Sequence, residues 1–114
     1  MYINKAIIYG NLTAKPGLKA LPSGQKTTSF SLATNRPYTD KDGNKRDEAS
    51  FHNVVAYGKQ AETICQYMDK GKALMVEGRL TTRSWEQEGK KHYKTEIILE
   101  NFQFGQKKEE EIPF

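Results

Sequence analysis

The stretch "KALMVEGRLTTRSW" (residues 72–85) decides the fold. Side chains alternate between the two sides of a strand. One side of this run carries an apolar set, which is Leu74, Val76, Gly78 and Leu80. The run is long for a strand, and its glycine stands in the middle, where glycine usually weakens the pairing. In a small barrel, a glycine at such a position lets the strand bend sharply at a corner. We therefore predict a barrel in which this long strand bends at Gly78.

Four further strand-like runs surround this one. They are rich in β-branched and aromatic residues, and they read "YINKAIIYGNL" (2–12), "TTSFSLATNR" (27–36), "SFHNVVAYG" (50–58) and "HYKTEIILENFQF" (92–104). Between them stand turn-forming segments rich in Gly, Pro, Asn and Asp, which let the backbone reverse. The chain is therefore predicted to consist mostly of strands and turns.

One helix is predicted between the third and fourth strands, in "KQAETICQYMDKG" (59–71). Its apolar residues recur with the spacing of a single helical face, and they are Ala61, Ile64, Cys65 and Met68. Gly71 supplies the left-handed conformation that commonly ends a helix. Three strands, a helix and two strands is the order of the OB-fold, an all-β five-stranded barrel with one helix between strands 3 and 4. An open five-stranded sheet with the helix across one face is the alternative.

The charge of the chain is divided unevenly. Residues 1–108 contain 18 basic and 11 acidic side chains, a net charge of +7, whereas "EEEIPF" (109–114) carries −3. A small basic body attracts polyanions through space, although an ordinary soluble surface explains the same composition. The single cysteine, Cys65, excludes an intramolecular disulfide and a multi-Cys zinc site. No signal peptide or membrane-spanning run is found, so we expect a soluble, cytoplasmic protein.

Aromatic and cationic side chains share one side of the predicted sheet. Phe51 and Tyr57 lie on the side of the third strand opposite to its apolar set. On the fourth strand, the side opposite the apolar set carries Arg79, Arg83 and Trp85. Exposed aromatic rings stack on unpaired bases, at roughly 1–3 kcal/mol per base, and neighbouring cations neutralise the phosphates. The pattern therefore indicates a platform for single-stranded nucleic acid that is largely indifferent to sequence. Alternatively, these aromatics are core, interface or strand-end residues.

Residues 37–47 are predicted to form a loop that folds over bound nucleic acid. This loop carries Tyr38 and the cations Lys41, Lys45 and Arg46. The segment "EQEGKK" (86–91) is a second candidate, because loops at these places are common ligand sites in OB-folds.

No catalytic or metal site is predicted. The segment "DKDGN" resembles the start of a calcium loop, but Lys45 and Phe51 occupy the positions where glycine and glutamate are needed. His52 and His92 lack partners at metal-ligand spacing, and we interpret His52 as a structural or subunit-contact residue. No phosphate loop, nucleophile elbow or carboxylate pair is present. We therefore expect neither an enzyme nor a bound cofactor.

The chain closely resembles the bacterial single-stranded DNA-binding proteins over nearly its whole length. The resemblance is carried by "NKAIIYGNL", "FSLATN", "FHNVVAYGK", "GKALMVEGRLTTRSW" and the final "EEEIPF". It implies an OB-fold subunit of a homotetramer that coats and protects single-stranded DNA during replication, repair and recombination, in the cytoplasm and associated with the nucleoid. It also implies a C-terminal tip that recruits proteins acting in those processes.

The resemblance also assigns residues to roles. The base-stacking aromatics of the family correspond to Tyr38, Phe51, Tyr57 and Trp85. For phosphate contact we assign Arg36, Lys45, Arg46, Lys59, Arg79 and Arg83. The partner-docking tip corresponds to Glu109, Glu110, Glu111, Ile112, Pro113 and Phe114. These assignments divide the chain into a DNA-binding domain (1–104), a very short linker (105–108) and the tip (109–114).

The sequence departs from the family pattern in two places. Tryptophan is common in the family where Tyr38 and Phe51 stand, so stacking is expected to be somewhat weaker here. The family usually has a long linker before the tip, whereas here only "GQKK" (105–108) separates it from the last strand. Other interpretations remain open, namely a single-stranded RNA binder, a protein-interaction adaptor and, least of all, a small nuclease.

Overall fold

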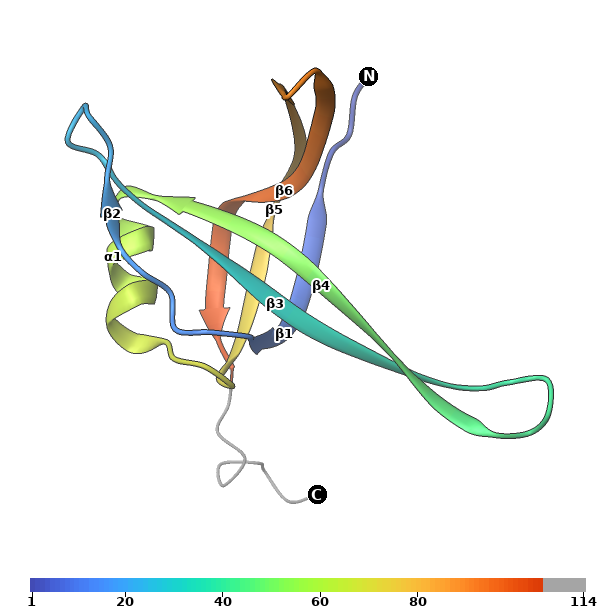
Figure 1. Ribbon diagram of the computed structural model, residues 1–114. Coiled ribbons are helices and arrows are strands. Elements are labelled where there is room, and N and C mark those ends of the chain that lie inside the picture. Colours follow the sequence, from blue (N-terminus) through green and yellow to red (C-terminus); the bar gives the residue numbers. More distant parts are fainter. Residues whose placement is uncertain (106–114) are drawn as a thin grey trace.

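The computed structural model describes residues 1–105, and the predicted tip (109–114) and most of the linker lie outside them. The elements in chain order are β1 (Ala6–Leu12), β2 (Lys19–Ala20), β3 (Lys26–Thr39), β4 (Lys45–Tyr57), α1 (Gly58–Tyr67), β5 (Ala73–Gln87) and β6 (Lys90–Phe104) (Figure 1). The helix thus lies between the third and fourth long strands, as predicted. The short β2, which pairs with the start of β3, was not predicted.

The strands form a closed barrel. β1 pairs antiparallel with β5 along most of its length and with β3 at Asn11 and Leu12. β6 pairs antiparallel with β5, and it pairs parallel with β4 through Val54↔Ile97 and Val55↔Ile98. Because β3 pairs in turn with β4, the ring is complete. This closure confirms the OB-fold prediction and excludes the open sheet.

Two glycines stand where neighbouring strands approach too closely for a side chain. β5 has a bulge between Glu77 and Gly78, as predicted for the bend, and a Cβ on Gly78 would collide with the carbonyl oxygen of Ile98. A Cβ on Gly10 would lie 2.5 Å from the carbonyl oxygen of Ala33, where β1 meets β3. Bulges and glycines of this kind let a sheet bend enough to close.

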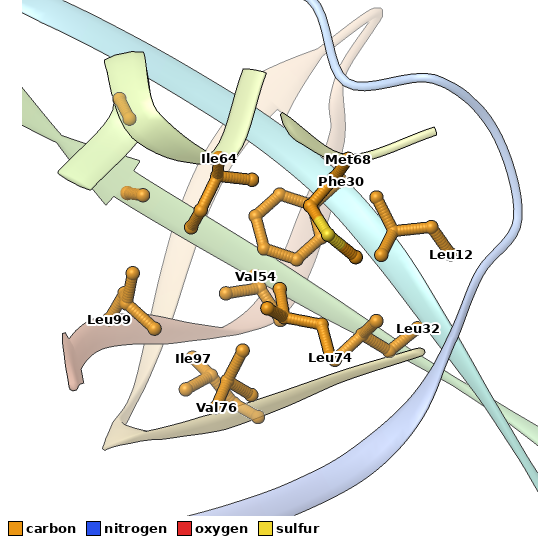
Figure 2. Packing of buried hydrophobic residues seen from close by; sticks show 12 residues of the cluster. Leu12, Phe30, Leu32, Val54, Ile64, Met68, Leu74, Val76, Ile97 and Leu99 are labelled. Atoms are coloured by element: carbon orange, nitrogen blue, oxygen red, sulfur yellow. The ribbon is translucent and has the colours of Figure 1, made fainter. Parts of the chain in front are cut away.

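The barrel interior is filled by one apolar cluster, most of which Figure 2 shows in close-up. The strands contribute Leu12, Phe30, Leu32, Val54, Ala56, Leu74, Val76, Ile97 and Leu99. The helix adds Ala61 and Ile64, and Met68, directly after the helix, joins them. Three of the four predicted stripe residues are thus in the core, whereas Cys65 is only half-buried and lies outside the cluster. Full burial of each Leu, Ile or Phe contributes about 1.5–3 kcal/mol, so this cluster holds the helix against the barrel.

The end of the helix differs from the prediction. α1 stops at Tyr67, and Met68 is already extended, with φ −101° and ψ 152°. Gly71 does have a positive φ, 87°, but it lies beyond the helix and donates its N–H to the carbonyl oxygen of Leu12 at 2.8 Å. Met68 leaves the helical conformation while its side chain remains in the core. The prediction that Gly71 ends the helix is therefore wrong.

Two long hairpins extend from the barrel (Figure 1). The pairing of β3 with β4 is unbroken from Thr27↔Tyr57 to Thr39↔Lys45, so most of the segment predicted as a loop (37–47) is strand. The Asp40 carboxylate explains why the turn is so short. It accepts hydrogen bonds from the N–H groups of Asp42 and Asn44 within the turn, both at 2.9 Å.

The second predicted loop (86–91) is also mostly strand. β5 continues to Gln87 and β6 begins at Lys90, which leaves only Glu88 and Gly89 between them. Both have positive φ, 55° and 77°, as a two-residue hairpin turn of type I′ requires. Among residues 1–105, no helix is long and apolar enough to cross a membrane.

Candidate nucleic-acid interface

The strand register determines which side chains face away from the core. Val54 lies in the core opposite Ile97, so Val55 and its partner Ile98 face outward. Ile98 is also the partner of Arg79 on β5, and residues directly opposite one another on paired strands point to the same side. We call this side of β4, β5 and β6 the outer face.

Five of the predicted contact residues lie on the outer face, which are Phe51 and Tyr57 of β4 and Arg79, Arg83 and Trp85 of β5. Phe51 is 65% exposed and Trp85 is 39% exposed. Aromatic rings of this size normally bury much of their surface. Three exposed rings and two guanidinium groups on one side of a sheet therefore form a surface suited to flat, anionic ligands.

Tyr38 does not share this surface. It pairs with Arg46, whereas Phe51 pairs with Ala33, and the register between these positions has no irregularity. Since 46 and 51 differ by an odd number of residues, Tyr38 and Phe51 lie on opposite faces of the β3–β4 hairpin. Tyr38 is exposed there, with the guanidinium carbon of Arg36 6.0 Å from its ring centroid. We predicted that Tyr38 lies in a loop that folds over bound nucleic acid. Tyr38 lies in strand β3 instead, so the prediction of a loop is wrong.

Each of the four predicted phosphate-binding arginines pairs with a carboxylate. The N···O distances are 3.7 Å for Arg36–Glu48, 2.9 Å for Arg46–Asp40, 3.8 Å for Arg79–Glu100 and 2.8 Å for Arg83–Glu96. Glu96 is buried, whereas Glu48 and Glu100 are exposed, and exposed pairs contribute about 0.2–1 kcal/mol. At Arg36 and Arg79, a phosphate can therefore replace the exposed carboxylate at little cost.

The two predicted lysines differ from the arginines. Lys45 begins β4 and Lys59 lies in the first turn of α1, and both are exposed. Neither forms an ion pair with any residue in the described part of the chain. Their ammonium groups thus remain available to a phosphate.

Hydrogen bonds and neighbouring charges shift the pKa values of three side chains, which are Asp40, Lys5 and Glu77. The hydrogen bond from the Arg46 side chain, aided by the N–H of Asn44, lowers the pKa of Asp40. Between β1, β5 and β6, the hydrogen bond to Glu100 and the charge of Glu77 raise the pKa of Lys5. A hydrogen bond from Asn101, followed by the charge of Lys5, lowers the pKa of Glu77.

β6 brings residues to the outer face that our sequence analysis did not assign. His92 lies opposite Trp85, and their rings are stacked with centroids 5.7 Å apart. Lys94 and Glu96 follow on the same face of the strand. The signal was present in the sequence, because a two-residue turn at Glu88–Gly89 fixes which residue of β6 faces Trp85.

The remaining histidine and the possible metal ligands support no further site. His52 is half-buried on the inner side of β4, with its Nε2 atom 2.9 Å from the hydroxyl of Thr34. Within residues 1–105, no group of three or more His, Cys, Asp or Glu side chains is placed to hold a metal ion. The outer face is therefore the most prominent candidate for ligand binding.

Together, the closed barrel and this surface define an OB-fold protein with an exposed aromatic and cationic sheet face. The sequence model of the Single-strand binding protein family matches residues 3–105. The chain therefore belongs to the single-strand binding protein family, which confirms the resemblance noted in the sequence.

Individual relatives agree with this assignment. The chain is 46% identical over 99 residues to a single-stranded DNA-binding protein of Aquifex aeolicus (strain VF5), covering 87% of this chain and 67% of that one. It is 42% identical over 103 residues to one of Staphylococcus aureus (strain N315), covering 90% and 65%. The chain thus spans about two thirds of the length of these curated relatives.

Solved structures show the same fold. The Plasmodium falciparum SSB in complex with ssDNA matches with a TM-score of 0.86 and 31% identity, covering 93% of this chain and 97% of that chain. A deletion mutant of the single-stranded DNA-binding protein from Thermus aquaticus matches with a TM-score of 0.81 and 31% identity, covering 93% and 52%.

Proposed function

We propose that this chain is a non-catalytic protein that binds and protects single-stranded DNA without strong sequence preference. The observation that carries the proposal is the outer face, where Phe51, Tyr57 and Trp85 are exposed beside Arg79 and Arg83. Relatives that share the fold are named as single-stranded DNA-binding proteins, and one was solved with ssDNA. Family membership supports a role in replication, repair and recombination in the cytoplasm.

The physical basis of binding is stacking combined with phosphate neutralisation. Each base that stacks on an aromatic side chain contributes roughly 1–3 kcal/mol, whichever base it is. A duplex keeps its bases paired and stacked inside, so only a single strand can use the three rings. As Arg79 and Arg83 of the outer face neutralise phosphates, counterions are released from the strand, so affinity falls as salt rises.

We propose that the chain also associates with copies of itself, as a homotetramer. The outward side of β1 exposes the apolar side chains of Ile7 and Tyr9. From Ala6 to Gly10, β1 pairs with β5 but not with β3, so one of its edges remains open over these residues. A second copy can pair with such an edge and cover the apolar side chains. Light scattering would show a tetramer, whereas a monodisperse monomer at micromolar concentration contradicts this.

For residues 109–114 we propose a separate role in recruiting other proteins that act on DNA. Three glutamates favour basic pockets, Ile112 and Phe114 supply apolar area, and Pro113 limits the conformations lost on docking. In this proposal residues 1–104 bind DNA, and residues 105–108 act only as a linker. Deletion of 109–114 is expected to leave DNA affinity unchanged or slightly higher and to abolish capture of partners. A large loss of DNA affinity would refute this division.

A fluorescence titration tests the central proposal. Trp85 is the only tryptophan, so its emission reports on the outer face alone. Oligo(dT) is expected to quench it to saturation, and the affinity should fall between about 50 and about 200 mM salt. Matched oligo(rU) and duplex DNA distinguish DNA binding from RNA binding and from general attraction to polyanions. The absence of quenching by a folded protein would favour the adaptor interpretation instead.

A further inference from the structure

The surroundings of Trp85 contain an arrangement that the assigned roles do not explain. The rings of Trp85 and His92 are stacked, with an interplanar angle of 22° and centroids 5.7 Å apart. The guanidinium carbon of Arg83 lies 5.5 Å from the indole centroid. Arg83 in turn donates from Nε to a carboxylate oxygen of Glu96 at 2.8 Å. All four side chains lie on the outer face of β5 and β6. Trp85 and His92 are direct cross-strand partners, whereas Arg83 is opposite Lys94 and reaches Glu96 diagonally.

We propose that His92 is a further binding residue of the outer face and that Glu96 is the residue that positions Arg83. The inference rests on the proposed function and extends its site. The imidazole and the indole lie nearly parallel and next to each other, so they present two rings to a strand that crosses the hairpin. A side chain held by a neighbour loses little conformational freedom when a base stacks on it, and this preorganisation increases affinity.

The contribution of Glu96 follows from which nitrogen of Arg83 it binds. Glu96 is only 5% exposed and accepts the hydrogen bond from Nε, with the ammonium of Lys94 3.9 Å from its other oxygen. A guanidinium has five N–H donors in a rigid fork. Because Glu96 uses the one on Nε, the terminal amino groups of Arg83 are left for a phosphate beside the Trp85 ring. A fully exposed carboxylate would compete with phosphate, whereas this one orients the cation from beneath.

The first experiment compares three variants by the anisotropy of a labelled oligo(dT). His92→Ser removes the second ring and is expected to weaken binding about two- to tenfold, the range of aromatic pair energies. His92→Phe keeps a ring and should stay within about twofold of the unaltered chain. Tyr93→Ser is the matched control, because Tyr93 is exposed on the opposite face of the same hairpin, and it should change nothing.

The outcomes separate this inference from the proposed function. Unchanged binding by His92→Ser, equal losses in His92→Ser and His92→Phe, or an equal loss in Tyr93→Ser would overturn the role of His92. Failure of the unaltered chain to bind oligo(dT) at all would instead overturn the proposed function, and this inference with it. The emission of Trp85 without DNA should also change in His92→Ser but not in Tyr93→Ser.

The second experiment is a double-mutant cycle of Glu96→Gln and Arg83→Gln. If Glu96 acts only by orienting Arg83, its replacement weakens binding in the unaltered chain and has no effect once Arg83 is absent. Additive losses would overturn the positioning role. Arg83→Lys provides a second measure that leaves the buried carboxylate paired. Lysine lacks separate donors for Glu96 and phosphate, so full retention of affinity would also contradict the proposal.

Discussion

Replacement of Phe51 by alanine tests whether the exposed rings serve binding or stability. Phe51 is 65% exposed and lies outside the core cluster, so its removal takes little apolar surface out of the interior. Substitutions at exposed positions usually change the free energy of unfolding by less than about 0.5 kcal/mol. The loss of one stacked base, in contrast, costs roughly 1–3 kcal/mol of binding free energy. We therefore expect oligo(dT) affinity to fall about 5- to 150-fold while the melting temperature stays nearly constant.

Tyr93→Ala provides a closely matched control. Tyr93 is 66% exposed, and it also lies on a strand of an extended hairpin. It points to the other face of its hairpin, away from the outer face. Both variants are measured by oligonucleotide anisotropy and by thermal unfolding followed with circular dichroism. Equal losses of affinity in the two variants, or an unfolding temperature that falls with the affinity of Phe51→Ala, would refute the reasoning.

Three further predictions follow from the same contacts. Gly78→Ala should destabilise the fold by about 1–3 kcal/mol or more, because the added Cβ collides with backbone at the bulge; an unchanged melting temperature contradicts this. Arg46→Gln should move the pKa of Asp40 up toward its ordinary value, measured by an NMR pH titration, because the guanidinium that lowers it is gone. The Asp40 interaction is thus present above the ordinary carboxyl range and is lost only as pH falls through the lowered pKa. Glu48→Gln should release Arg36 and raise oligo(dT) affinity about two- to fivefold with a steeper salt dependence; equal affinity would mean that the pair does not compete with phosphate.

The parts of the site that sequence predicted best were those inside regular strands. A strand has a strict period of two residues, so the common side of Phe51 and Tyr57 was readable without any structure. Gly78 was readable for a similar reason, because a glycine in the middle of an apolar strand needs a bend or a close backbone approach to explain it. The common side of Phe51 and Tyr57 and the bend at Gly78 both depend on neighbouring residues in the sequence, so they could be predicted without knowing which strands pair.

The parts that sequence did not predict depend on pairing with distant strands. The turn residues of 37–47 suggested a loop, because nothing local shows that Pro37 and Tyr38 pair with residues of β4. Without that pairing, parity could not be counted across the segment, and the face of Tyr38 stayed undetermined. The prediction for Leu80, which we placed in the apolar set of its strand, was wrong for another reason. It keeps the inward side of β5, opposite the buried Ile97, but is 46% exposed, because the buried inward positions of β5 end at Gly78 and Leu80 lies just beyond them.

The opposite orientation of Tyr38 and Phe51 restricts how one strand can use both rings. Tyr38 pairs with Arg46, and Phe51 pairs with Ala33. These two pairs lie on opposite faces of an unbroken hairpin. Along β4, residues 46 and 51 are five positions apart, about 17 Å of extended chain. A bound strand that stacks on both rings must therefore pass around the edge of the hairpin, or else reach Tyr38 on a second copy of the chain. In either case Tyr38 engages a different part of the strand from Phe51. Our proposal thus predicts two separate contact regions for the four aromatics, and it predicts that a short oligonucleotide on the outer face occupies only one of them.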